Sequence, residues 1–393
     1  MNKAILNKEV QKFIDVNLRL DTNRLMLKKP IFIEVSNKEL AEQISAKLKC
    51  KDKLPTWFGL ENGLFPVKIS IEQTSSEETA KYKSSLISGK NIVDLTGGFG
   101  VDDFYFSSNF DLLIHCELNP ELSEITEHNF KELGVGNCTF IQGDGLVFLQ
   151  NSEEKFDWIY LDPSRRSEIK GKVFLLKDCL PNVPDNLELL FSKSNNVMMK
   201  TSPLVDISQG ISELKGVKEI HVVAVKNEVK ELLWILEKEC SGDILIKTVN
   251  LIGEDKQEFE FVLSSEGNQD PKYSLPLNYL YEPNSAILKS GAFNQVSVQL
   301  ELFKLNKHSH LYTSQDLIPF PGRSFEIKEV VPFQKKVLKK RFGESKANIT
   351  IRNFPKKVDE LRKDLNIKDG GDVYLFFTTN RTGEKVCLVC GKV

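Results

Sequence analysis

A glycine-rich turn behind a short apolar strand pattern constrains this chain more than any other stretch. Residues 91–95 are apolar except at the first position and at Asp94, and three glycines follow within four positions: Gly97, Gly98 and Gly100. This pattern predicts a buried parallel strand that ends in a tight turn at the start of a helix. Glycine suits the turn because the backbone there takes positive φ and approaches a ligand closely. The sequence therefore predicts a binding site outside the carboxyl end of this strand, where open α/β sheets hold ligands.

Length and composition limit the class of protein. A chain of 393 residues is too long for one ordinary core, which predicts two to four domains. Its 40% apolar and 27% charged residues are typical of a soluble globular protein, and its net charge is −2, so any nucleic-acid affinity must come from a local basic region. No apolar run approaches the roughly 18 residues of a membrane span. Seven scattered cysteines favour reduced thiols, so we expect a cytoplasmic protein that is not bound to a membrane.

Strand and helix patterns alternate from residue 91 onward, which predicts a parallel sheet of an α/β protein. A mainly helical region is expected before it, with Ser36 and Glu39 as the capping box of one helix. The expected strands are 91–95, 112–116, 138–142, 156–161, 196–200, 219–225, 244–251 and 258–263. A helix is expected at 229–236, because its apolar residues follow helical spacing.

Smaller units are expected after this sheet. A linker rich in Gly, Asn and Asp leads to a small ferredoxin-like α/β unit, and a small α+β domain with a strand hairpin at 372–379 and 385–390 ends the chain. The predicted domains are residues 1–85, 86–265, 266–322 and 323–393.

Acidic residues follow four successive predicted strands: Asp94, Glu117, Asp144 and Asp162. Because the carboxyl ends of parallel strands meet at one edge of a sheet, we expect these side chains along that edge. An adenosine ligand suits such a set, since one carboxylate can accept from both ribose hydroxyls and another from the adenine amino group. Glu117 lies 17 residues after Gly100, the spacing at which an acid ending the second strand meets a ribose.

These residues resemble those of class I S-adenosylmethionine-dependent methyltransferases, and the whole chain is similar to bacterial methyltransferases with a carboxy-terminal THUMP-like domain. The resemblance rests on residues 94–102, Glu117, Asp144, Asp162-Pro163 and the terminal run 349–354. It implies a Rossmann-like seven-stranded sheet whose last strand runs antiparallel. It also implies S-adenosylmethionine as the cofactor.

The resemblance assigns the cofactor contacts. The methionine moiety falls to Asp94, Thr96, Gly97, Gly98 and Gly100, the ribose to Glu117, the adenine face to Leu118, and the adenine amino group to Asp144 with Gly145 alongside. A nicotinamide-binding Rossmann domain is the rival, since its G-x-G-x-x-G turn holds a pyrophosphate at a helix start. Here Asp103 stands at the position of the third glycine, where its charge opposes a diphosphate. The pattern therefore favours the sulfonium cofactor.

The expected catalytic residues are Asp162, Pro163 and Arg165. Base-amino methyltransferases carry Asp/Asn-Pro-Pro followed by an aromatic residue that stacks on a flipped base, and that aromatic residue is missing here. Arg165 and Arg166 have two interpretations. They bind a phosphate or carboxylate of the substrate, or they form a salt bridge within a solvent-exposed loop.

A basic segment near the end of the chain is the second informative region. Residues 323–368 hold 14 Lys/Arg and 6 Asp/Glu, a net charge of +8. Its densest part predicts a helix with the charges on one side and Phe333, Val337 and Phe342 on the other, and the charged residues are Lys335, Lys336, Lys339, Lys340 and Arg341. Such a run is either a solvated helix face or a surface for a phosphate backbone. The resemblance implies RNA binding, because THUMP domains of other methyltransferases bind structured RNA.

The leading hypothesis is a methyltransferase that acts on RNA, with the THUMP-like domain contributing substrate binding. The alternatives are a methyltransferase for a small molecule or a protein, and a non-catalytic RNA-binding protein that retains the fold. No metal is expected: Cys387 and Cys390 lie three apart on a predicted strand, so they point to opposite faces, which disfavours joint binding of one metal ion.

Overall fold

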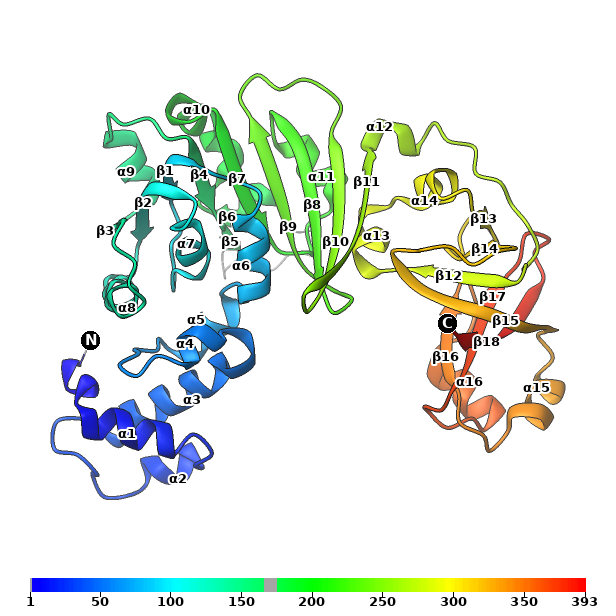
Figure 1. The fold of residues 1–393 in the computed structure, drawn as a ribbon, viewed down its shortest axis with the longest axis horizontal. Helices are drawn as coiled ribbons and strands as arrows, with labels where there is room; N and C mark the ends of the chain where they lie inside the picture. The colour runs from blue at the N-terminus through cyan, green and yellow to red at the C-terminus, as the bar shows by residue number, and fades with distance from the viewer. Residues whose placement is uncertain (1, 166–174) are drawn as a thin grey trace. The chain divides into compact units, whose positions relative to one another are not determined.

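The computed structural model describes residues 2–165 and 175–393. The chain divides into two compact units, Met1–Lys218 with Leu232–Ser241 and Glu219–Glu231 with Gly242–Val393. The largest sheet among the described residues has nine strands in the order β11-β10-β8-β9-β7-β4-β1-β2-β3 (Figure 1). The expected α/β class is therefore confirmed, whereas the expected count of seven strands is too low. Within the described part of the chain, no helix is long and apolar enough to cross a membrane.

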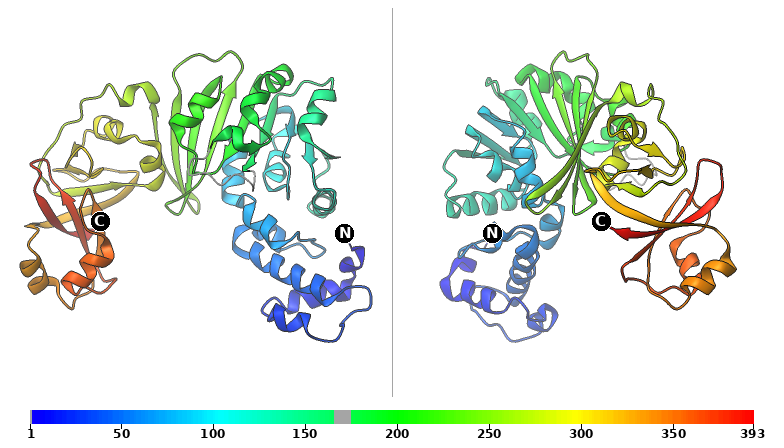
Figure 2. Two further views of the ribbon diagram at one scale, coloured as in Figure 1. Left: turned by 180° about the vertical axis from the view of Figure 1, so that it is seen from behind. Right: turned by 45° about the vertical axis from the view of Figure 1, so that its right-hand side comes forward.

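Helices make up the amino-terminal region, as expected. They are η1 (Lys3–Leu6), α1 (Lys8–Val16), α2 (Thr22–Met26), α3 (Asn37–Lys53), α4 (Pro55–Phe58), α5 (Lys68–Gln73) and α6 (Glu77–Ser84). Helix α3 begins at the predicted capping box, in which Ser36 accepts from the Glu39 amide and Glu39 accepts from the Ser36 amide. Figure 2 shows α1–α5 gathered apart from the strands of their unit. Their buried side chains, Trp57 among them, join one core with Phe99 and Val101 from the glycine turn and the helix after it.

Parallel strands alternate with helices in the rest of the first unit. The strands are β1 (Gly89–Asp94), β2 (Phe110–Glu117), β3 (Cys138–Gln142), β4 (Trp158–Leu161) and β7 (Asn196–Thr201), with the short β5 (Ser164–Arg165) and β6 (Cys179–Leu180) paired beside them. The helices are α7 (Val101–Phe106), α8 (Pro120–Glu132), α9 (Gly145–Asn151), η2 (Leu176–Asp178), α10 (Val183–Lys193) and α11 (Ile207–Glu213). Neighbouring strands β7, β4, β1, β2 and β3 all run parallel, so their carboxyl ends share one edge.

The helix expected at residues 229–236 is wrong, because the chain forms strand β9 (Glu228–Glu237) there, antiparallel to β7. Before it, Lys226 and Asn227 both take positive φ, at 50° and 65°, which is the backbone of a two-residue hairpin turn after β8 (Val217–Val225). Leu232 to Leu236 are all buried. A strand buried on both faces has the same apolar run as a buried helix, so spacing alone cannot separate the two. The eight strands expected from the pattern are present, and β9 is the ninth.

The second unit carries β10 (Leu245–Ile252) and β11 (Asp255–Val262), and then a seven-stranded sheet in the order β13-β14-β12-β15-β18-β17-β16. The strands of that sheet are β12 (Tyr279–Pro283), β13 (Phe303–Lys304), β14 (Tyr312–Ser314), β15 (Gly322–Pro332), β16 (Asn348–Arg352), β17 (Val373–Thr379) and β18 (Lys385–Lys392). Its helices are α12 (Leu263–Glu266), α13 (Ser285–Ser290), α14 (Phe293–Gln299), α15 (Lys335–Phe342) and α16 (Val358–Leu365). Strand β15 pairs with both β12 and β18, so one continuous sheet spans the end of the chain.

Two local predictions for the end of the chain are confirmed, and one is wrong in part. Strands β17 and β18 form the expected antiparallel hairpin. Cys387 and Cys390 lie in separate core clusters, as their spacing on a strand requires. Helix α15 buries Leu338 and Phe342, but Val337 is 47% exposed instead of facing the core. The predicted domain boundaries at residues 85, 265 and 322 stay a prediction.

Candidate active site

Four acidic residues lie at one edge of the sheet in the first unit. Asp94 and Glu117 are the last residues of β1 and β2, Asp162 follows β4 directly, and Asp144 follows β3 by two residues. Strands β4, β1, β2 and β3 are parallel neighbours in that order. The structure therefore brings together the strand ends that the sequence analysis singled out.

The glycine turn follows β1 and holds Glu117. Gly98, at φ 58°, donates its amide to one oxygen of Glu117 at 2.9 Å, and the Asn119 amide donates to the other oxygen at 2.7 Å. Gly100, at φ 71°, is the residue from which α7 begins. At Gly97, a methyl group would meet the His115 ring at 2.1 Å, so only glycine fits between β1 and β2. One backbone amide of the turn and one backbone amide just after β2 thus hold the carboxylate of Glu117.

Asp94 lies deeper than a direct ligand contact requires. It is 2% exposed and accepts from the Thr96 amide at 2.7 Å and from the Thr96 hydroxyl at 3.0 Å. Burial, and then the charge of Asp103, raise the pKa of Asp94 well above its usual range. Asp103 itself bonds His115 Nδ1 at 2.6 Å, and burial lowers the pKa of His115, so the imidazole is neutral at pH 7. Asp94 therefore stabilises the turn from its buried side, through its two hydrogen bonds with Thr96.

The residues predicted to hold adenine have different surroundings. Asp144 is exposed and caps α9 by accepting from the Leu146 and Val147 amides at 2.8 and 3.2 Å. A hollow of about 570 Å³ opens beside it. Leu118 is 71% exposed, as a side chain that packs on a ligand face would be. Gly145 is buried, and a methyl group there would meet the carbonyl oxygen of Leu95 at 2.5 Å, so its glycine is explained by packing against the strand.

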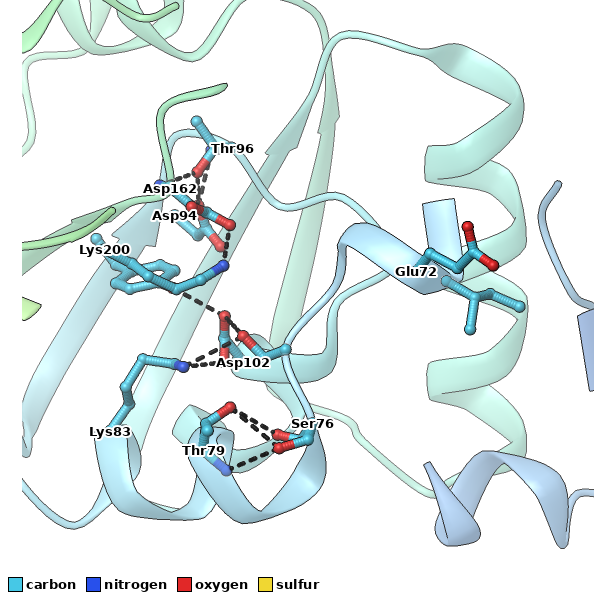
Figure 3. Close-up of polar contacts among 12 residues, drawn as sticks. Glu72, Ser76, Thr79, Lys83, Asp94, Thr96, Asp102, Asp162 and Lys200 are labelled. Atoms are coloured by element: carbon cyan, nitrogen blue, oxygen red, sulfur yellow. Dashed lines mark hydrogen bonds and ion pairs between the residues drawn. The ribbon is translucent and has the colours of Figure 1, made fainter. Parts of the chain in front are cut away.

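Asp162 is held by its backbone and by its side chain. Its amide donates to the Thr96 hydroxyl at 2.7 Å, and that hydroxyl in turn donates to Asp94 (Figure 3). Lys200, the next-to-last residue of β7, forms an ion pair with the carboxylate of Asp162. Pro163 is buried, and Ser164 and Arg165 form the short strand β5. Arg166 lies outside the described residues.

Sequence reasoning missed Lys200 and a second buried lysine, Lys83. Lys83 is fully buried and forms an ion pair with Asp102 at 3.2 Å. A signal for Lys200 was available, because it is the one charged residue in an apolar run at the edge that carries the four acids. Lys83 gave no such signal, since the one other lysine of its helix, Lys81, is an exposed surface residue.

The predicted RNA-binding residues belong to the second unit, on α15. Lys335 bonds Asp364 at 2.7 Å, and Arg341 forms a two-pronged ion pair with Glu329. Lys336, Lys339 and Lys340 are exposed, and in the part of the chain that the structure describes they form no ion pair. Three of the five predicted cations on this helix are therefore exposed to solvent without an acidic partner among the described residues. Among the described residues, no group of three His, Cys, Asp or Glu side chains is arranged to hold a metal ion.

Comparison with known proteins identifies relatives of both units. One family model, described as THUMP domain-like, matches residues 322–392, and another, described as a ferredoxin-like domain, matches residues 279–321. A candidate methyltransferase from Porphyromonas gingivalis W83 has a crystal structure similar to the whole chain, at 32% sequence identity and a TM-score of 0.89. That similarity covers 100% of this chain and 98% of that protein.

A curated relative matches a shorter part. An uncharacterised RNA methyltransferase of Clostridium acetobutylicum is 30% identical over 147 residues, which are 34% of this chain and 31% of the relative. The matched part thus spans about a third of that protein's length. The chain belongs to the class I S-adenosylmethionine-dependent methyltransferase family whose members carry a carboxy-terminal THUMP-like domain.

Proposed function

We propose that this protein is a cytoplasmic methyltransferase that transfers the methyl group of S-adenosylmethionine to RNA. One observation carries the proposal. The acidic residues Asp94, Glu117, Asp144 and Asp162 follow four neighbouring parallel strands and end at one edge, beside a turn built from glycine. A protein that used this fold only as a scaffold has no need of four carboxyl groups at one edge, since burying or grouping such groups costs free energy.

The residues present fit the cofactor. Each oxygen of Glu117 accepts one backbone amide and keeps a lone pair for a ribose hydroxyl. Asp144 uses one oxygen as a helix cap, and its exposed carboxylate borders the hollow beside α9. At Gly98, a side-chain methyl group would meet only the Thr96 carbonyl oxygen, at 3.7 Å, so the turn is open to a ligand there. These features support an adenosine-containing ligand held across β1, β2 and β3.

The chemistry asks little of the protein beyond alignment. When bound, S-adenosylmethionine supplies a methyl group whose carbon–sulfur bond breaks as the acceptor's lone pair bonds the methyl carbon. Asp162, which is fixed by Thr96 and Lys200, accepts a hydrogen bond from the acceptor atom and orients its lone pair. The acceptor's proton then leaves to this carboxylate or to solvent.

RNA is supported as the substrate by two independent features. The relative from Clostridium acetobutylicum is described as an RNA methyltransferase, and the THUMP-like domain displays exposed lysines on α15. Lysines on one helix face neutralise a phosphate backbone without reading its sequence. Arg165 and Arg166 remain candidates for contact with a substrate phosphate, and Arg165, Asp162 and Pro163 remain the proposed catalytic residues.

The test combines cofactor binding with methyl transfer. We expect calorimetry to detect binding of S-adenosylhomocysteine, and Glu117→Ala to weaken it by roughly 10- to 100-fold, the loss typical of a charged hydrogen-bond acceptor. The control is Asp111→Ala, which removes an exposed carboxylate from the same strand. Tritium from labelled S-adenosylmethionine should enter total cellular RNA. If the label enters protein or small molecules instead, RNA is not the substrate, and if the cofactor does not bind, the proposal fails.

A further inference from the structure

Lys200 and Asp162 form an ion pair at the acceptor end of the site. Strands β4 and β7 are parallel neighbours, so the residues that end them meet at the same edge. The ammonium group of Lys200 contacts Oδ2 of Asp162, and Figure 3 shows the two side chains pointing toward one another. The side chain of Lys200 is 11% exposed and that of Asp162 is 34% exposed. The carboxylate therefore stays accessible from the site while its partner is buried.

A second pair of charges lies behind Lys200. Asp102 of α7 accepts from Ser75 at 2.8 Å, from the Tyr160 hydroxyl at 2.8 Å, and pairs with the fully buried Lys83. Burial alone would raise the pKa of Asp102, but Lys83 and then Lys200 outweigh burial and lower it. Positive and negative groups thus alternate from the interior to the site edge, in the order Lys83, Asp102, Lys200, Asp162. The negative charge of Asp102 therefore attracts the ammonium of Lys200 from its buried side.

Thr96 fixes the other part of Asp162. Its hydroxyl accepts from the Asp162 amide and donates to the buried carboxyl group of Asp94. This one oxygen atom therefore links the glycine turn after β1 to the residue that follows β4. Asp162 is therefore held at its backbone by Thr96 and at its carboxylate by Lys200.

We propose that Lys200 is a positioning residue for methyl transfer, acting through the carboxylate of Asp162. The inference rests on the proposed function and adds to it the residue that aims this carboxylate at the acceptor. In the transfer step, the acceptor's lone pair forms the bond to the methyl carbon, the carbon–sulfur electrons stay on sulfur, and the acceptor's proton leaves to Asp162 or to solvent. Lys200 sets the rotamer in which Asp162 meets that proton, and it does not touch the acceptor or the cofactor.

The experiment compares Lys200→Met with Lys200→Arg in the full-length protein. Lysine-to-methionine substitution keeps the length of the side chain and removes its charge, whereas arginine keeps the charge. We expect Lys200→Met to lower kcat for methyl transfer into total cellular RNA by roughly 10- to 100-fold, the range for a misaligned catalytic group, and Lys200→Arg to restore part of it. Affinity for S-adenosylhomocysteine should stay within about twofold of the wild type, because the change removes an interaction of the acceptor side alone.

Two controls separate positioning from stability. Lys47→Met removes another buried lysine, which pairs with Asp15 in the amino-terminal helices, and it should lower thermal stability without lowering kcat. A double-mutant cycle with Asp162→Asn tests the route of the effect. If Lys200 acts through Asp162, Lys200→Met should cost little kcat in the Asp162→Asn background.

The outcomes differ for the two proposals. Wild-type kcat in Lys200→Met, or full additivity in the cycle, overturns the positioning role while the methyltransferase proposal stands. A loss of kcat that Lys47→Met reproduces at equal loss of stability also overturns it. A wild-type protein that binds no S-adenosylhomocysteine overturns the proposed function, and the positioning role with it.

Discussion

At the scale of single residues, two different requirements explain the glycines of the turn after β1. Gly98 takes a positive φ of 58°, whereas Gly97 is required because the ring of His115 occupies the space where its side chain would be. The sequence predicted the first requirement, since positive φ and ligand approach are general reasons for glycine. It could not predict the second, because that depends on which residue of β2 faces the turn.

We therefore expect Gly97→Ala to destabilise the protein strongly. The added methyl group would lie 2.1 Å from the His115 ring, so β1 and β2 must separate, at a cost of about 1–3 kcal/mol typical of overpacking. Chemical denaturation measures the free energy of unfolding. Gly136→Ala is the matched control, because nothing lies within 4 Å of a methyl group there and its φ is not positive. Equal stability of the two variants would contradict this account of Gly97.

Because the carboxyl group of Asp103 is buried, we expect Asp103→Asn to raise the thermal stability of the protein by an amount that depends on pH. Burial, and then the charge of Asp102, raise the pKa of Asp103 well above its usual range. The folded state therefore holds the proton of Asp103 more tightly than the unfolded state does. The stability that this group contributes is fully present below the unfolded-state pKa of about 3.9, and it is lost as the pH rises toward the folded-state pKa. Asparagine keeps the shape, can hydrogen-bond His115 Nδ1 through its side-chain amide, and has no carboxyl proton to lose. The Tm of the variant should exceed that of the wild type by at least about 2–4 °C at pH 8 and by less at pH 5. A gain that is larger at pH 5 would contradict the raised pKa.

At the scale of elements, the hairpin of β8 and β9 marks the limit of pattern reading. The expected strands came from apolar runs bounded by turn residues, and the structure confirms all eight of them. The helix predicted at residues 229–236 was wrong for two reasons. The apolar residues there also fit helical spacing, and Lys226-Asn227 is not among the common hairpin turn pairs. The acidic site was predictable because strand ends of a parallel sheet meet. The pairing of Lys200 with Asp162 was not, since the sequence does not show that β7 lies next to β4 in the sheet.

The turn at Lys226 also offers a stabilising change. A positive φ of 50° costs more conformational free energy for lysine than for asparagine. Two-residue turns of this type favour asparagine and glycine. We expect Lys226→Asn to raise the free energy of unfolding by about 0.5–1 kcal/mol, measured by urea denaturation. Lys215→Asn is the control, because it is an exposed lysine before β8 whose φ is not positive. Equal gains in both variants would point to charge and not to backbone conformation.

At the scale of the whole molecule, the two units supply different parts of the proposed function. The first unit holds the acidic strand ends, and the second holds the THUMP-like domain with its exposed lysines. The net charge of the chain is −2, so attraction to RNA depends on where the cations lie and not on their total number. Lys335 and Arg341 already pair with Asp364 and Glu329, which leaves Lys336, Lys339 and Lys340 as the cations most available to phosphate.

Neutralising these three lysines to glutamine should weaken RNA binding and its dependence on salt together. Each lysine that neutralises a phosphate contributes about 0.7–0.9 to the slope of log K against log salt concentration. We expect the triple variant to lower that slope by roughly 2–3 in filter-binding titrations of total cellular RNA. The control neutralises Lys8, Lys12 and Lys51, three exposed lysines of the amino-terminal helices, and makes the same change in net charge. If both triple variants lower the slope equally, RNA responds to overall charge. If neither does, α15 is an ordinary solvated helix face, and the first unit must then bind the methyl acceptor without it.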